Sequence, residues 1–283
     1  MITFSDTGIE DPRLTFDGGV AAIDLMTLRR CAQKGVDLGF PLQLPEAADV
    51  EVPPIFDDLC VVEADTDSGR LIVKAMIDTA KMTWAFDSDV YVRAESFTDY
   101  SGATTYGVRL EDPFAASIDG VVVSFAPMKL RDGRPLRLWF ADMPQSRLDT
   151  MGFRELFAWA ESLSRRFQPR QRLDWIIVPA QQIAYERRLV ELLPVNQPQL
   201  EDAGQRFAMT LDETGVRVRV ESRVCLAAAF GPNLNHTFGA DDPVVMWLTA
   251  EGSSVPFAVI ATTAEAWLRP GHQVAFGGGH GAV

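Results

Sequence analysis

Short apolar runs, separated by Gly, Asp and Ser, dominate the chain from residue 59 onward. β-Branched and aromatic residues are frequent in these runs, and several runs alternate apolar with polar positions, which favours strands over helices. The pattern predicts strands over residues 59–64, 71–77, 89–95, 106–110, 121–125, 135–141, 173–178, 207–211, 215–224, 244–250 and 257–262.

Helical spacing of apolar residues is confined to a few segments. Residues 20–34 are predicted to form a helix that ends near Gly35, and a short helix is expected at residues 185–193. The clearest helix covers residues 151–166, with Asp149 or Thr150 as its cap. Strands and helices do not alternate regularly, so the pattern predicts an α+β fold with mainly antiparallel sheets and a few helices.

Changes in composition divide the chain of 283 residues into three parts. Residues 1–54 hold the first helix and a Pro-rich connector, residues 55–270 a β-rich core, and residues 271–283 a flexible Gly-rich tail. With 47% hydrophobic residues, the chain has enough apolar side chains for a substantial core.

The charge of the chain limits its partners. The net charge is −13, which disfavours binding to nucleic acid and to anionic membranes. No apolar stretch is long enough to span a bilayer, and the first residues lack the pattern of a secretory signal. Cys31, Cys60 and Cys225 form an odd, sparse set that is typical of reduced thiols, so we expect a cytoplasmic protein.

Catalytic and metal-binding motifs are missing from the sequence. His236, His272 and His280 have no second His or Cys at ligand spacing, so we expect solvated or loop histidines, no metal and no cofactor. Cys225 has no activating neighbour beyond Arg223 and is expected to be a buried thiol. Four arginines after the second helix are expected to balance its dipole and to face solvent. They are Arg165, Arg166, Arg170 and Arg172. The prediction is therefore a protein that is not an enzyme.

One stretch near the C-terminus resembles a known family. Residues 238–248 read Phe-Gly-Ala-Asp-Asp-Pro-Val-Val-Met-Trp-Leu, which is similar to the closing signature of the serpins. Residues 71–77, 136–144 and 175–179 resemble serpin strands in the same order along the chain. The resemblance covers about residues 70 to 270 and implies a truncated serpin-like core that lacks most of the N-terminal helices.

The hinge region departs from that of an inhibitory serpin. An inhibitor has Glu-Glu-Gly-Thr followed by small residues at this place, whereas residues 221–230 read Glu-Ser-Arg-Val-Cys-Leu-Ala-Ala-Ala-Phe. Bulky side chains and Pro232 suit strand insertion poorly, and the run to the closing signature is short. The resemblance therefore implies a non-inhibitory member of the fold.

Two segments carry basic residues at alternating positions. Arg217 and Arg219 alternate with valines in residues 216–220, and Lys74 shares a strand face with Met76. This surface is either an ordinary solvated sheet face or a docking strip for an extended, acidic peptide. The residues expected to contact such a peptide are Lys74, Met76, Arg217, Arg219, Glu221 and Val224.

The leading hypothesis is a peptide-binding protein that holds an extended peptide by strand addition to a serpin-like sheet. A precursor peptide in a ribosomal natural-product pathway, with its modifying enzymes, is one such partner. The alternatives are a protease inhibitor with a shortened reactive loop and a cyclase-like biosynthetic enzyme. A sheet without its covering layer is also protected by dimerisation, so a homodimer is among the expected assemblies.

Overall fold

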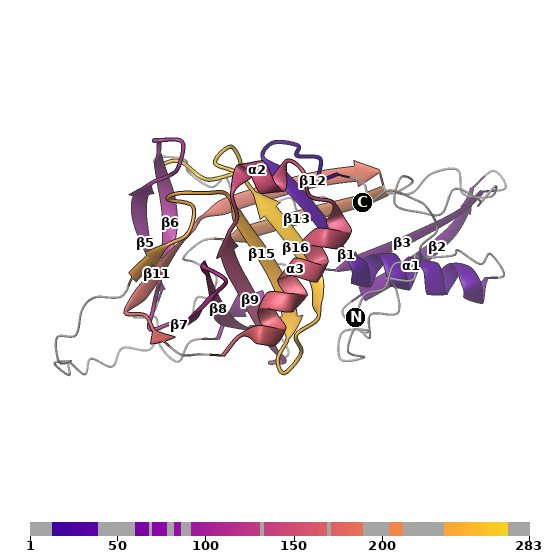
Figure 1. Ribbon diagram of the computed structural model, residues 1–283. Helices are drawn as coiled ribbons and strands as arrows, with labels where there is room; N and C mark the ends of the chain where they lie inside the picture. Colours follow the sequence, from indigo (N-terminus) through magenta and orange to yellow (C-terminus); the bar gives the residue numbers. More distant parts are fainter. Residues whose placement is uncertain are drawn as a thin grey trace.

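Hydrogen-bonded strands form most of the computed structural model, and two longer helices pack beside them (Figure 1). The structure describes residues 13–38, 60–67, 70–77, 82–85, 92–130, 133–168, 171–188, 204–211 and 235–270. Within these residues the helices are α1 (Leu25–Asp37), α2 (Gln145–Leu148) and α3 (Phe153–Arg166).

The largest sheet has the strand order β1-β16-β15-β9-β8-β7-β10, and β4 pairs with β8 beside this path. Its strands are β1 (Val20–Asp24), β4 (Met82–Trp84), β7 (Phe114–Ile118), β8 (Val121–Leu130), β9 (Pro135–Asp142), β10 (Gln171–Arg172), β15 (Val244–Ala250) and β16 (Pro256–Thr262). All strand pairings among the described residues of this sheet are antiparallel.

Continuous apolar sequence places β15 and β16 at the centre of the core. Every residue of both strands is buried, as expected for strands covered on both faces. Helix α3 covers part of this sheet, and the indole Nε1 of Trp247 donates a 2.7 Å hydrogen bond to Ser164 Oγ of the helix. Trp139 and Trp247 stack in parallel at 5.9 Å between ring centroids. The Trp247–Ser164 hydrogen bond ties the helix to the sheet, and the tryptophan stack joins β9 to β15 within it.

Three smaller sheets complete the described structure. The first has the order β14-β11-β6-β5, with β5 (Val92–Thr98), β6 (Thr104–Glu111), β11 (Trp175–Pro179) and β14 (Asn235–Thr237). The other two are hairpins, β2 (Cys60–Asp67) with β3 (Arg70–Ile77) and β12 (Gln181–Arg188) with β13 (Gly204–Leu211). Only β11 and β14 pair in parallel among the described strands.

The predicted fold class is confirmed, because the described sheets are mainly antiparallel and helices are few. Most predicted strands are present, with somewhat different ends. Residues 215–224, predicted as a strand, lie outside the described residues. The division into residues 1–54, 55–270 and 271–283 stays a prediction, although β1 is part of the main sheet.

Three local predictions were wrong. Val20–Asp24 is a strand and not the start of a helix, because this buried apolar run pairs with β16 along its whole length. Residues 185–188 belong to β12 and not to a helix. Gly152 occupies the N-cap of α3 without a side-chain hydrogen bond. The side chains of Asp149 and Thr150 instead bond back to the preceding turn, α2.

Candidate peptide-binding surface

The hairpins β12–β13 and β2–β3 each present a long outer edge. Within the described residues β13 pairs only with β12, and β3 pairs only with β2. Each hairpin is in register over eight residue pairs. Main-chain N–H and C=O groups along an unpaired edge are a template for another extended chain.

The core holds one face of the β12–β13 hairpin. Ile183 is buried, and Gln181 donates from Nε2 to Met246 Sδ of β15 at 3.0 Å. The Tyr185 hydroxyl donates to the carbonyl oxygen of Thr15 at 3.2 Å. These residues alternate along β12, so every second position faces the main sheet. The hairpin is thereby fixed in place through this face.

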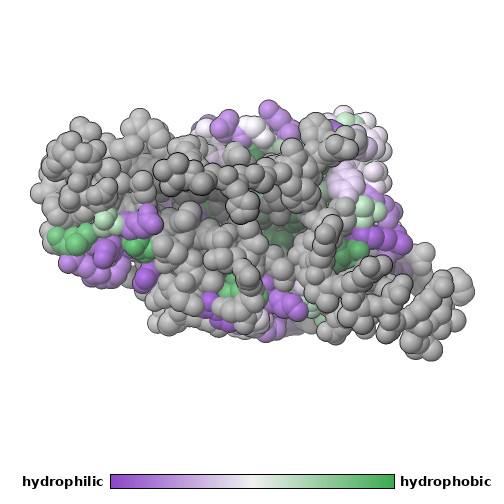
Figure 2. Space-filling view, turned by 180° about the vertical axis from the view of Figure 1, so that it is seen from behind, coloured by the Kyte–Doolittle hydropathy of each residue, from purple (hydrophilic) through white to green (hydrophobic). Residues whose placement is uncertain are grey.

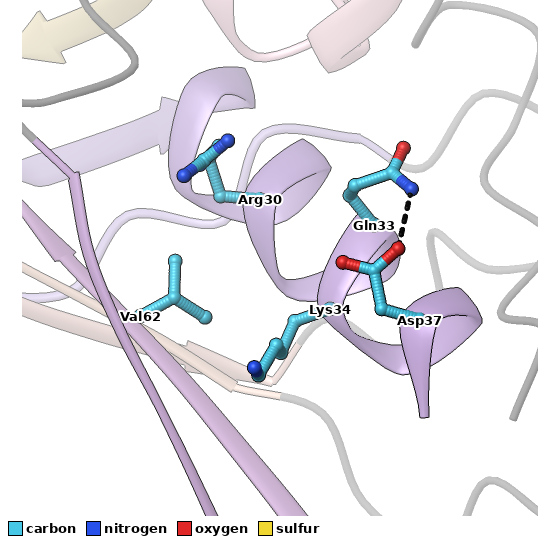
Figure 3. Close-up of a pocket in the computed structure, with 5 residues that line it drawn as sticks. All are labelled: Arg30, Gln33, Lys34, Asp37 and Val62. Atoms are coloured by element: carbon cyan, nitrogen blue, oxygen red, sulfur yellow. Dashed lines mark hydrogen bonds between the residues drawn. The ribbon is translucent and has the colours of Figure 1, made fainter. Parts of the chain in front are cut away.

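Helix α1 lies beside the β2–β3 hairpin and encloses a hollow of about 250 Å³ (Figure 3). The hollow is lined by Arg30, Gln33, Lys34, Asp37 and Val62. Arg30 and Lys34 are one helical turn apart, whereas Asp37 accepts a 3.0 Å hydrogen bond from Gln33 Nε2. The lining thus includes two basic side chains and one carboxylate.

The register of the hairpin defines the position of Lys74. Val62 lines the hollow beneath α1, and the next residue along β2, Glu63, is exposed. Lys74 lies directly opposite Glu63, and Met76 lies opposite Val61. Residues opposite one another in an antiparallel pair share a face. By register, Lys74 and Met76 therefore belong to the face of the hairpin opposite to the face of Val62.

The sequence-predicted contact residues are only partly within the described structure. Lys74 and Met76 lie on β3, as their predicted strand requires. Arg217, Arg219, Glu221 and Val224 lie outside the described residues, as does Cys225. Whether the two groups meet on one surface therefore stays a prediction.

His236 corrects one expectation from the sequence. It is not a solvated loop residue but part of β14, and its side chain is only 24% exposed. Its Nε2 lies 2.7 Å from Asp142 Oδ2 of β9, and Asp142 Oδ1 accepts a 2.9 Å hydrogen bond from the amide of Gly239. Burial raises the pKa of Asp142, and the hydrogen bond from His236 opposes that rise. The contact ties β14 to the main sheet where the chain returns from residues 212–234.

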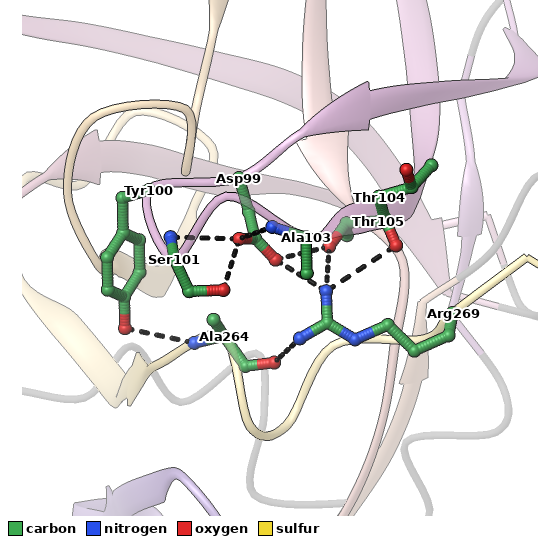
Figure 4. A network of polar contacts seen from close by, with 8 residues as sticks. All are labelled: Asp99, Tyr100, Ser101, Ala103, Thr104, Thr105, Ala264 and Arg269. Carbon is green, nitrogen blue, oxygen red and sulfur yellow. Dashed lines mark hydrogen bonds and ion pairs between the residues drawn. The ribbon is translucent and has the colours of Figure 1, made fainter.

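A second polar cluster, also missed from the sequence, surrounds Asp99 (Figure 4). The buried carboxylate accepts hydrogen bonds from the backbone amides of Ser101 and Ala103 and from three side chains. These side chains are Ser101, Thr105 and Arg269. The cluster joins the β5–β6 turn to the segment that follows β16. Its residues are up to 170 positions apart in the chain, so no local pattern could reveal it.

The two arginines in the last turn of α3 do more than balance its dipole. Arg165 pairs with Glu161 one turn earlier in the helix. Arg166 binds Asp119 through two hydrogen bonds of 2.7 Å, which link α3 to the turn between β7 and β8. Both arginines are exposed, as the sequence suggested, and their role in the described structure is to make ion pairs.

Hydrophobic residues are scattered over one face of the described structure. On the face shown in Figure 2, the coloured hydrophobic areas are small and separate, with hydrophilic residues between them. No group of His, Cys, Asp and Glu side chains suited to a metal ion occurs among the described residues. Within the same residues, no helix has the length and apolarity required to cross a bilayer.

Comparison with known proteins finds neither a matching family model nor a matching curated protein. The solved structures to which the chain is similar are serpins. They include the thermophilic serpin tengpin in its native state, at a TM-score of 0.46 and 12% identity, covering 71% of this chain and 57% of tengpin.

Two further serpins show the same partial similarity. An Arabidopsis serpin matches at a TM-score of 0.38 and 13% identity, over 68% of this chain and 55% of its own. Thyroxine-binding globulin in complex with thyroxine matches at 0.41 and 13% identity, over 70% of this chain and 57% of its own. The chain thus covers less than two thirds of the length of each.

Proposed function

We propose that this protein is a non-catalytic peptide-binding protein that accepts an extended, acidic peptide as an added strand. The observation that carries the proposal is the outer edge of β3, which has no partner strand among the described residues although β3 is eight residues long. The edge of β13 supports it in the same way. A strand-forming peptide of similar length matches either edge.

Strand addition divides affinity and selectivity between different groups. Main-chain hydrogen bonds hold the peptide without regard to its sequence, and alternate side chains are read by the faces on each side. In the proposed complex, Lys74 and Met76 contact the peptide from β3. Arg217, Arg219, Glu221 and Val224 contact it from the segment that follows β13.

Charge defines the proposed ligand class. The contact residues include three cations, Lys74, Arg217 and Arg219, in a chain with 39 acidic residues against 26 basic ones. Arg30 and Lys34 add positive charge beside the same hairpin. A precursor peptide with an acidic segment, held for modifying enzymes, is the biological ligand we propose.

Charge reversal tests the selectivity. The variant K74E/R217E/R219E should bind a synthetic acidic peptide, acetyl-(Val-Glu)4-amide, about tenfold or more weakly than the parent chain. Each exposed ionic contact contributes only about 0.2–1 kcal/mol, so three must be reversed together to reach the 1.4 kcal/mol of a tenfold change. Calorimetry at low and high salt measures both the loss and its screening.

A matched variant controls for overall charge. K129E/R147E/R154E makes the same change in net charge on β8, α2 and α3, which are not part of either hairpin. We expect this control to retain nearly the parent affinity, with circular dichroism to show that both variants are folded. Equal affinity of the parent and K74E/R217E/R219E, or an equal loss in the control, would show that these three cations do not select the peptide.

A further inference from the structure

Strand β5 is an exposed edge on the far side of the molecule from the β2–β3 hairpin (Figure 1). Within the described residues it pairs with β6 alone. Ala94, Ser96 and Thr98 are exposed, and no described strand pairs with this edge of the four-stranded sheet. A seven-residue strand with an open edge is long enough to pair with another strand.

The turn between β5 and β6 shows which residues direct their main-chain groups outward. The amide of Asp99 donates to the carbonyl of Ala103 at 2.9 Å, so these residues form a hydrogen-bonded pair. Hydrogen-bonded pairs recur at every second residue of an antiparallel ladder. Arg93, Glu95 and Phe97 therefore bond to β6, and the N–H and C=O groups of Val92, Ala94, Ser96 and Thr98 point to the open edge.

Ion pairs cover the face that carries the odd-numbered residues of β5. Arg109 of β6 lies 3.2 Å from Glu95 and 2.8 Å from Glu111, and Arg93 lies 3.4 Å from Glu111. The Arg109 guanidinium also lies over the ring of Trp175, 4.6 Å from its centroid. Arg93 is 54% exposed and Glu95 35%, so both remain accessible at the edge.

We propose that two copies of this chain associate by antiparallel pairing of β5 with β5 about a two-fold axis at Ala94. Ala94 then lies opposite its own copy, and Val92 lies opposite Ser96 of the partner. These three hydrogen-bonded pairs use the outward main-chain groups, with two hydrogen bonds each.

Charge selects this register over its neighbours. With the axis at Ala94, Arg93 lies opposite Glu95 of the second copy in both halves of the interface. These are the pairs without main-chain bonds, where side chains come closest. Shifting the axis to Arg93 or to Glu95 would place like charges opposite one another. The sequence Arg-Ala-Glu is thus self-complementary in a two-fold arrangement, as an isologous interface requires.

Two single charge reversals provide a test that does not depend on stability alone. The R93E variant has Glu at positions 93 and 95, and the E95R variant has Arg at positions 93 and 95. Each should dimerise at least about tenfold more weakly than the parent chain in sedimentation equilibrium at low salt. A mixture of the two should form a heterodimer, because every opposed pair is then Arg with Glu. Two monomeric variants that fail to associate when mixed would overturn the proposal.

Proline substitution tests the main-chain pairing. A94P removes an N–H that points away from β6, a position where an edge strand tolerates proline. We expect A94P to stay folded and to dimerise at least about tenfold more weakly, whereas A94V, which keeps the N–H, should dimerise like the parent. A parent chain that is monomeric at several hundred micromolar, or an A94P variant that dimerises normally, would contradict the proposed interface.

Discussion

At the scale of single residues, Asp99 is a buried charge held entirely by hydrogen bonds. Burial raises the pKa of its carboxyl group, but hydrogen bonds from Ser101, Thr105, Arg269 and the Ala103 amide outweigh burial and hold the pKa well below its usual range. The ionised form is therefore more stable in the folded chain than in the unfolded one. This contribution is present above the unfolded pKa of about 4 and is lost as the pH falls below it.

Replacing Asp99 by Asn should lower the free energy of unfolding by about 2 kcal/mol at pH 7, since hydrogen bonds to a charged group are stronger than those to an amide. Urea unfolding at several pH values measures the difference. The difference in free energy of unfolding between the parent chain and D99N should be constant from pH 5 to 8 and should become smaller below pH 4. The exposed variant D241N is the control, and a difference that does not become smaller in acid would refute this role of the charge.

The pKa of Asp142 is shifted in the opposite direction to that of Asp99. Burial raises its pKa and the hydrogen bond from His236 lowers it, with a net shift upward. A carboxyl group with a raised pKa contributes stability below the unfolded pKa, and this contribution is lost as the pH rises through the folded value. His236 therefore matters most above the raised folded pKa of Asp142, where the carboxyl group is charged.

The variant H236A should be destabilised by about 2 kcal/mol at pH 7 and by less at pH 4, because only the ionised Asp142 is left without its partner. The double variant H236A/D142N should recover part of the loss at pH 7, since the buried group is then neutral. Thermal unfolding at the two pH values checks both. A loss of equal size at pH 4 and pH 7 would mean that His236 acts by packing against Phe238 rather than through Asp142.

At the scale of elements, Gly239 shows how closely the loop after β14 packs. Its φ of +85° favours glycine, and an added Cβ would lie 2.7 Å from the ring of Trp267. Gly252, in the β15–β16 turn, has a similar φ of +81° but open space around it. The two positions separate backbone strain from crowding.

Alanine at Gly239 should cost about 1–3 kcal/mol more than alanine at Gly252, because only the first meets the rigid indole ring. Strain from the positive φ is common to both and cancels in the comparison. Chemical unfolding of G239A and G252A measures the difference. Equal destabilisation of the two variants would show that Trp267 can move aside at little cost.

The strands of the main sheet could be predicted because their apolar runs are local. Residues 244–250 and 257–262 are apolar apart from Thr249 and Thr262 near their ends, and both stretches are buried strands. The same reasoning wrongly predicted a helix at Val20–Asp24. A short apolar run fits a helix or a strand equally well, and here the pairing with β16 makes it a strand. In β12 the buried residues Gln181, Ile183 and Tyr185 alternate, but the polar Gln181 hides the period of two.

Residues of the candidate site were harder to predict than strands. Lys74 could be placed on its strand because alternation is a property of the local sequence. The contact between His236 and Asp142 joins residues 94 positions apart, and the cluster around Asp99 reaches 170 positions. Such contacts are created by sheet topology, which a single sequence does not reveal.

At the scale of the whole molecule, the two proposed interactions use different edges. The peptide is proposed to add to the β3 or β13 hairpin, and the second copy to β5. These strands belong to three separate sheets, so each interaction can be removed while the other is retained. A dimer formed at β5 would carry two peptide sites, and A94P should bind peptide with the affinity of the parent chain.

The central claim is that a peptide binds through its main chain as an added strand. The most direct measurement compares three peptides by calorimetry. They are acetyl-(Val-Glu)4-amide and two versions of it that are N-methylated at alternate residues, one along one edge of the extended peptide and one along the other edge. Methylation keeps the charges and side chains but removes the donors that pair with β3 or β13. We predict that methylation on one of the two edges abolishes measurable binding, whereas methylation on the other leaves it largely unchanged. Equal affinity of all three peptides would contradict strand addition.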